Sequence, residues 1–168
     1  MDFFNPHCQS GPYTQEAFGV CDDQNSQVAY VDTDLANAKE KWTATVKNEK
    51  QIPVTFTAVD GCVIRASAEP GRGRCDAMLT TTKSLFLLEL KERKGKGDWR
   101  KVACDQLEST ICFLIEHHTK QLVQFTRKKA QACNSKRPGF VELEPELKLR
   151  FSKYGFRIDT QATVVVVS

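Results

Sequence analysis

The sequence contains no long apolar run. Its longest strongly apolar segment is Val164–Val167, far shorter than the roughly 20 residues that a membrane-spanning helix needs. The first ten residues, MDFFNPHCQS, carry an early acid, no basic region and no apolar stretch of about 7–15 residues, so they do not resemble a secretory signal. We therefore expect a cytoplasmic protein that does not associate with a membrane.

Paired cysteine motifs and several common catalytic signatures are also missing. The chain has 7 cysteines, an odd number, and no two of them form a C-x-x-C pair, so we expect reduced thiols. His7, Cys8 and Cys21 could supply half of a zinc site, but no matching second half follows. The absence of G-x-x-x-x-G-K, H-E-x-x-H and G-x-S-x-G motifs argues against P-loop, zincin and α/β-hydrolase enzymes.

The composition is that of an ordinary globular domain. The 168 residues are 40% hydrophobic and 27% charged, and no repeat or low-complexity tract occurs among them. A chain of this length fits one domain and buries roughly 70% of its unfolded surface, so it needs neither a metal nor a disulfide merely to fold. Residues 1–31 show no clear period and predict a partly ordered N-terminal arm, while residues 32–168 predict a single domain.

Basic charge is concentrated in two short segments. The net charge of +3 is too small to indicate a nucleic-acid-binding protein by itself. Residues 91–101, however, contain six bases against two acids, and residues 127–137 contain five bases and no acid. Either segment could simply be a solvated loop, but the first one directly follows the strand discussed below.

Hydrophobic periodicity predicts a mixed α/β fold. We expect helices over 33–48, 98–117 and 145–154, with Asp98 capping the second, and a basic loop over 127–138. Alternating or continuous apolar segments predict strands over 52–59, 62–66, 75–80, 85–92, 121–126 and 156–167. Because a helix joins the strands over 85–92 and 121–126, these two strands should be parallel neighbours.

Three charged residues break the apolar pattern of the predicted sheet. Glu89 and Lys91 lie two residues apart on a strand and therefore point to the same face. A turn centred between Thr82 and Lys83 places Asp76 directly opposite Glu89, with Cβ atoms about 4.5–5.5 Å apart. Two carboxylates that close repel each other unless a cation lies between them, and Mg²⁺ commonly binds one or two carboxylates. The alternative is a solvated strand edge.

The segments Arg74-Cys75-Asp76 and Glu89-Leu90-Lys91 resemble the motif of the PD-(D/E)XK nuclease superfamily, with Cys75 at a variable position. The resemblance covers roughly residues 33–126 and implies a restriction-endonuclease-like core, in which helices flank a mixed central sheet in the order α-β-β-β-α-β. It implies Mg²⁺, with Mn²⁺ as a substitute, held by Asp76, Glu89 and the Leu90 carbonyl. Two weaker matches are Glu40, as a further metal-binding acid on the first helix, and Gln106, as a catalytic glutamine.

The resemblance implies a metal-dependent endonuclease that hydrolyses nucleic acid, with DNA favoured over RNA. Lys91 would position or activate water, and six basic residues would hold the phosphate backbone, namely Arg74, Arg93, Lys94, Lys96, Arg100 and Lys101. So small a chain could depend on a second copy or an ATPase partner for targeting. The alternative function is a catalytically silent subunit that binds nucleic acid or protein. Glu40 could be an ordinary surface acid, and Gln106 a satisfied buried amide.

Overall fold

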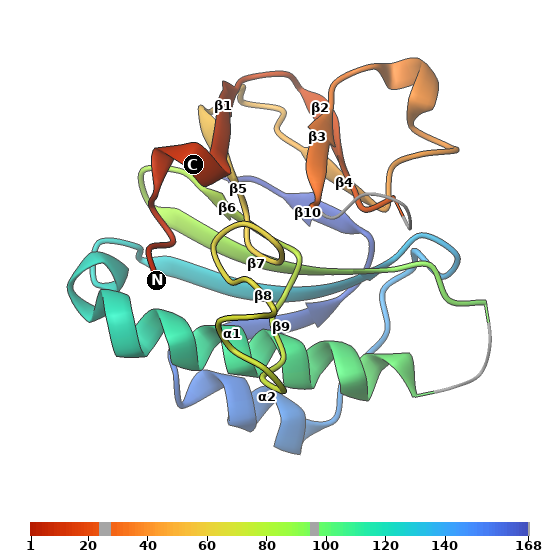
Figure 1. Cartoon of the computed structure of the whole chain (residues 1–168). Helices are drawn as coiled ribbons and strands as arrows, with labels where there is room; N and C mark the ends of the chain where they lie inside the picture. Colours follow the sequence, from red (N-terminus) through yellow and green to blue (C-terminus); the bar gives the residue numbers. More distant parts are fainter. Residues whose placement is uncertain (24–27, 95–97, 168) are drawn as a thin grey trace.

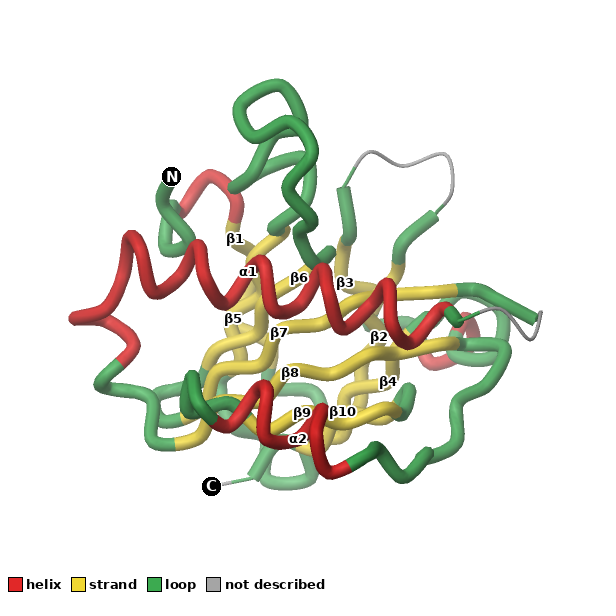
Figure 2. Tube along the Cα trace, turned by 90° about the horizontal axis from the view of Figure 1, so that it is seen from below, coloured by secondary structure: helices red, strands yellow, loops and turns green. Residues whose placement is uncertain are grey.

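The computed structural model describes residues 1–23, 28–94 and 98–167, and these form three layers (Figures 1 and 2). A six-stranded sheet lies in the middle. A four-stranded sheet packs on one of its faces, and the helices pack on the other. The predicted mixed α/β class is therefore confirmed.

The central sheet mixes antiparallel and parallel strands. Its spatial order is β1 (Gln9–Tyr13), β5 (Val54–Ala58), β6 (Ala77–Thr80), β7 (Ser84–Lys91), β8 (Arg127–Asn134) and β9 (Arg157–Thr160). Neighbours from β1 to β7 are antiparallel, whereas β7, β8 and β9 run parallel. Strand β7 is buried along its length except at Lys91, which explains why its sequence is apolar on both faces.

The four-stranded sheet has the order β10 (Thr163–Val165), β4 (Ala44–Lys47), β2 (Ala17–Cys21) and β3 (Tyr30–Asp32). Phe18 and Val46 from this sheet share an apolar core with Phe56 and Leu88 of the central sheet. Strand β2 contains Gly19, where a Cβ atom would lie 2.1 Å from Cγ of Trp42. Only glycine therefore lets the indole lie across this strand.

The described residues contain two α-helices, α1 (Trp99–Leu122) and α2 (Pro145–Ser152), and two 3-10 helices, η1 (Pro6–Cys8) and η2 (Leu35–Asn37). Asp98 caps α1 by accepting a hydrogen bond from the Lys101 amide at 3.3 Å. The regular part of α1 ends at a kink at His118, close to the predicted end. None of the described helices is long and apolar enough to cross a membrane.

The predicted helix over 33–48 is wrong. This segment contains η2 and then β4, whose residues alternate between buried and less buried positions. Thr43, Thr45 and Val46 are β-branched, and this preference for a pleated surface prevails over the approximate helical spacing. No α-helix precedes β5 in the described part of the chain, so the predicted α-β-β-β-α-β order is not reproduced.

Two predicted strands and one predicted loop are also wrong. Residues 62–66 follow the Asp60-Gly61 turn but form further turns, with one isolated bridge between Asp60 and Ile64. Residues 121–126 are the end of α1 and a turn, whereas β8 occupies residues expected as a basic loop. The basic side chains lie at the more exposed start of β8, whereas the residues of its second half are buried. The prediction of a parallel strand after the long helix is confirmed, with that strand lying later in the sequence.

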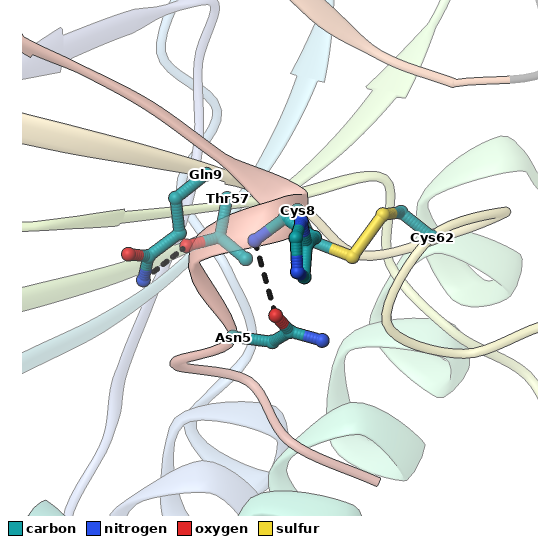
Figure 3. The surroundings of a disulfide bond; sticks show 6 residues. Asn5, Cys8, Gln9, Thr57 and Cys62 are labelled. Carbon is teal, nitrogen blue, oxygen red and sulfur yellow. Dashed lines mark hydrogen bonds between the residues drawn. A yellow bond between two sulfur atoms is a disulfide. The ribbon is translucent and has the colours of Figure 1, made fainter.

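The N-terminal segment is tied to the rest of the molecule by a disulfide. Residues 1–31, expected as an arm, contain η1, β1 and β2, and thus contribute a strand to each sheet. Cys8 at the end of η1 bonds to Cys62 in the turn after β5 (Figure 3). The expectation of reduced thiols is therefore wrong for these two residues, because the fold brings together cysteines that are 54 positions apart. The other five cysteines are free.

Removing this cross-link should lower stability without changing the fold. A disulfide restricts the unfolded chain, and the loss of one typically costs about 2–4 kcal/mol. We expect the Cys8→Ala/Cys62→Ala variant to unfold at a lower urea concentration than the parent. Adding a reductant should shift the parent toward the variant and leave the variant unchanged. Equal urea midpoints for the oxidised parent and the variant would contradict this expectation.

Candidate active site

The pairing of β6 with β7 fixes the position of Asp76. Ala77 pairs with Leu88 and Thr80 with Leu85, so the ladder places Asp76 opposite Glu89. The Asp76 amide also donates a hydrogen bond to the Leu88 carbonyl at 3.1 Å. The hairpin register predicted from the sequence is thus confirmed.

Glu89 and Lys91 project toward the helical layer. Leu85 and Leu87 of β7 pack in the core that contains α1, whereas Phe86 and Leu88 pack against the second sheet. By the alternation of a strand, Glu89 and Lys91 share the face of Leu85 and Leu87. Glu89 is fully buried, and its Oε1 lies 2.5 Å from Nζ of Lys91. The motif acid and lysine therefore form an ion pair between the sheet and α1.

Gln106 of α1 holds the other side of Lys91. Its Oε1 accepts a hydrogen bond from Nζ of Lys91 at 3.1 Å, and its Nε2 donates to the Arg74 carbonyl at 3.3 Å. The Gln106 side chain is therefore partly buried between α1 and the sheet. Gly73, which no pattern in the sequence singles out, also matters here, because a Cβ atom there would lie 3.2 Å from Cα of Gln106. A glycine there allows the segment before β6 to approach α1 closely enough for these contacts.

Asp76 is bound to the backbone of β7 as well as facing Glu89. Its Oδ2 accepts a short hydrogen bond of 2.6 Å from the Leu90 amide. Within a strand, the amide and carbonyl of one residue point to the same side, so the Leu90 carbonyl also faces the end of β6. This geometry presents a carbonyl oxygen beside the two carboxylates, as the family resemblance implies.

Burial makes both carboxylates hard to ionise. The pKa of Asp76 is raised from 3.8 to about 7, mainly by burial and also by the charge of Asp22, while the Leu90 amide and Lys91 oppose the shift. Burial also raises the pKa of Glu89 well above its ordinary value; the charge of Asp76 adds to this, and Lys91 opposes it. Without a cation, negative charge on these two acids is therefore costly.

Asp22 is a neighbour of this site that the sequence did not predict. Asp22 directly follows β2 and is half-buried. Burial raises the pKa of its carboxyl, the positive charge of Lys91 lowers it, and Asp60 raises it. It lies in a segment without a readable period, so no local pattern could have linked it to Asp76.

A divalent cation fits the donor atoms present. No group of three or more His, Cys, Asp or Glu side chains able to hold a metal occurs in the described part of the chain. Mg²⁺, however, is usually bound by one or two carboxylates together with water and phosphate oxygens. Glu89 supplies two buried oxygens; Oε1 is paired with the Lys91 ammonium, and Oε2 receives no hydrogen bond from the described residues. Such oxygens gain more from a cation than oxygens that water already satisfies.

The other residues that the sequence assigned to the site differ in their positions and contacts. Glu40 lies in an exposed turn after η2, not on a helix, and takes no part in the contacts that hold Asp76, Glu89 and Lys91. The Arg74 guanidinium already forms an ion pair with Asp60. Lys96 lies outside the described residues. Four predicted backbone-binding residues are exposed between the end of β7 and the first turn of α1, namely Arg93, Lys94, Arg100 and Lys101.

Comparisons of this chain with models of protein families, with curated proteins and with solved structures found no match. The likeness to the PD-(D/E)XK superfamily therefore rests on the motif residues and on their geometry. The sheet register and the contacts around Lys91 agree with that likeness, whereas the missing first helix departs from it.

The raised pKa of Asp76 predicts a pH-dependent stability in the presence of a chelator. Between about pH 4 and 7 the unfolded chain has released this proton while the folded chain retains it. The folded state then binds more protons, so its free energy of unfolding should fall as pH rises through this window. Asp76→Asn should make the decline shallower, and the exposed Glu49→Gln should not. Urea denaturation at several pH values measures both, and identical slopes for parent and Asp76→Asn would contradict the assignment.

Proposed function

We propose that this protein is a Mg²⁺-dependent nuclease that hydrolyses phosphodiester bonds, with DNA as the favoured substrate. The observation that carries the proposal is the opposed pair of Asp76 and Glu89 beside Lys91 on adjacent antiparallel strands. A buried acidic pair is costly to a fold, and such costs are typical of functional sites.

Asp76, Glu89 and the Leu90 carbonyl would hold the ion. A bound Mg²⁺ would lower the pKa of a water molecule and neutralise charge on the scissile phosphate. Lys91 would hold that water, or stabilise the charge that develops on the phosphate, with its ammonium group. Gln106 fixes the ammonium through a 3.1 Å hydrogen bond, so Lys91 stays in position when Glu89 turns its charge toward a cation.

The exposed bases beside the site would bind the nucleic-acid backbone. Arg93 and Lys94 directly follow the motif strand, and Arg100 and Lys101 lie in the first turn of α1. The Asn134 side chain accepts from the Arg93 amide at 3.2 Å and donates to the Arg93 carbonyl at 3.0 Å. This clamp orders the start of the basic segment. Such contacts are sequence-independent and weaken as salt concentration rises.

The direct test is cleavage of a panel of single- and double-stranded DNA and RNA, with Mg²⁺, with Mn²⁺ and with EDTA. We expect metal-dependent cleavage that is strongest on DNA. Binding of nucleic acid without cleavage of any substrate would overturn the proposal in favour of a silent nuclease-fold subunit.

Glu89→Gln and Lys91→Ala should separate metal binding from catalysis. Glu89→Gln removes a negative ligand, so it should weaken Mg²⁺ binding and abolish cleavage. Lys91→Ala should retain Mg²⁺ affinity but lower the cleavage rate by about 10²–10³-fold, the usual effect of losing one preorganised electrostatic group. Calorimetric Mg²⁺ titration and single-turnover cleavage measure the two effects, with the exposed Glu146→Gln as control. Parent-like cleavage by Lys91→Ala would exclude its catalytic role.

Neutralising Arg93 and Lys94 should weaken backbone binding equally for all sequences. Each lost phosphate contact should reduce the slope of log affinity against log salt by about 1. We expect the Arg93→Gln/Lys94→Gln variant to bind DNA with a flatter salt dependence than the parent. Fluorescence anisotropy at four salt concentrations provides the slopes, and Lys39→Gln/Lys120→Gln is a control of equal charge. An unchanged slope for the first variant would remove this segment from the interface.

A further inference from the structure

A cavity of about 600 Å³ lies at the other end of the central sheet from the candidate active site. It opens where β8 begins, beside the turn after α2 and next to β10. Ser84 pairs with Arg127 at this end, whereas Lys91 pairs with Asn134 at the other. Seven residues of strand separate the two pairs, about 23 Å at the usual rise. The cavity is therefore a separate site.

Positive charge dominates the cavity. Arg127, Lys128, Lys129 and Arg157 line it, and none of its described lining residues is acidic. Asp159, just behind them and nearly buried, pairs with both Lys129 and Arg157. One carboxylate thus serves two of the four cations.

Among the described residues, the other two cations donate only to neutral oxygens. Nζ of Lys128 donates to the Phe125 carbonyl at 3.0 Å, and a guanidinium nitrogen of Arg127 donates to the Val167 carbonyl at 3.0 Å. A carbonyl satisfies a hydrogen bond but does not cancel a charge. Cations that line one cavity repel one another, and a bound anion would relieve the repulsion.

The cavity also has an apolar side. Phe86 and Phe156 line it from the sheet and from the start of β9, and Val165 and Val167 stand at its rim. The two valines remain 46% and 47% exposed. Apolar surface beside arginines matches a ligand in which a flat, weakly polar group is joined to an anion. Arginine binds phosphate through two parallel hydrogen bonds, a geometry that lysine cannot reproduce.

We propose that this cavity binds a nucleotide, with the phosphate on Arg127 and Arg157 and the base against Val165 and Val167. The nucleotide is either free or the phosphorylated end of a strand. The inference does not depend on the proposed nuclease activity, because none of Asp76, Glu89 and Lys91 lines the cavity.

The test is calorimetric binding to the full chain in EDTA, so that no hydrolysis intervenes. The ligands are deoxyadenosine monophosphate, deoxyadenosine, inorganic phosphate and an oligonucleotide with or without a 5′-phosphate. We expect the nucleotide to bind more tightly than either the nucleoside or inorganic phosphate. Arg127→Gln/Arg157→Gln should weaken binding at least about tenfold, since charged hydrogen bonds are lost. Arg127→Lys/Arg157→Lys should fall between this variant and the parent.

Lys39→Gln/Lys120→Gln serves as a charge-matched control and should bind like the parent. Binding of the free nucleotide identifies a soluble ligand, and binding only of the 5′-phosphorylated oligonucleotide identifies a strand end; either supports the proposal. Parent-like affinity in Arg127→Gln/Arg157→Gln would overturn it, and so would equal affinities for nucleotide and inorganic phosphate. The melting temperature of each variant verifies that it is folded, and the lysine variant decides the matter if the glutamine variant is not.

Discussion

The burial of a carboxylate at the end of β7 is the constraint on which the candidate site depends. Glu89 is completely enclosed between the central sheet and α1. Removing a charge from water costs several kcal/mol unless an opposite charge offsets the penalty. Lys91 offsets part of it in the structure, and a divalent cation would offset more. An apolar residue at this position would cost less to bury, so packing alone does not explain the acid.

Four other segments of the fold contribute residues to the surroundings of this carboxylate. Strand β6 brings Asp76 into register, and α1 brings Gln106 to hold Lys91. The end of β2 adds Asp22, whose charge raises the pKa of Asp76. The turn that carries Asp60 pairs with Arg74, and the nearby disulfide fastens that turn to the N-terminal segment. The site therefore depends on both sheets and on a loop far from the motif in sequence.

Local patterns predicted the part of the fold that carries the motif. The strands β5, β6 and β7, the Asp98 cap and the regular length of α1 could all be predicted, because alternation, turn residues and capping are local signals. The hairpin arithmetic then placed Asp76 opposite Glu89. The strand β4 was mistaken for a helix, because Leu35, Ala38 and Trp42 happen to recur at helical spacing. Strand β8 is predicted as a loop because its first residues are basic, and the buried Ala130 and Ala132 that follow them give no strand pattern.

Other features could not be predicted from the sequence because they arise only from tertiary contacts. The Cys8–Cys62 bond joins two segments that have no shared pattern, and Asp22 approaches Asp76 only because one sheet stacks on the other. Gly73 could be recognised as a loop residue, but its role in admitting Gln106 depends on how closely α1 passes. Pairing within a hairpin is encoded nearby in the chain, whereas contacts between layers are encoded by the whole fold.

Charge is distributed unevenly along β7 and β8, and this distribution constrains any anionic ligand. One end of the pair holds Asp22, Asp76 and Glu89 near the partly buried Lys91, whereas the other end holds four cations around a cavity. A phosphate approaching the acidic end would be repelled by those carboxylates, and the exposed bases nearby could hold it only at the rim. A divalent cation would cancel the two negative charges of Asp76 and Glu89, and it could itself take a phosphate oxygen as a ligand. The same ion that makes a buried Glu89 tolerable would thus make the site attractive to the phosphate backbone, which links the cost of burying the acid to the chemistry proposed for it.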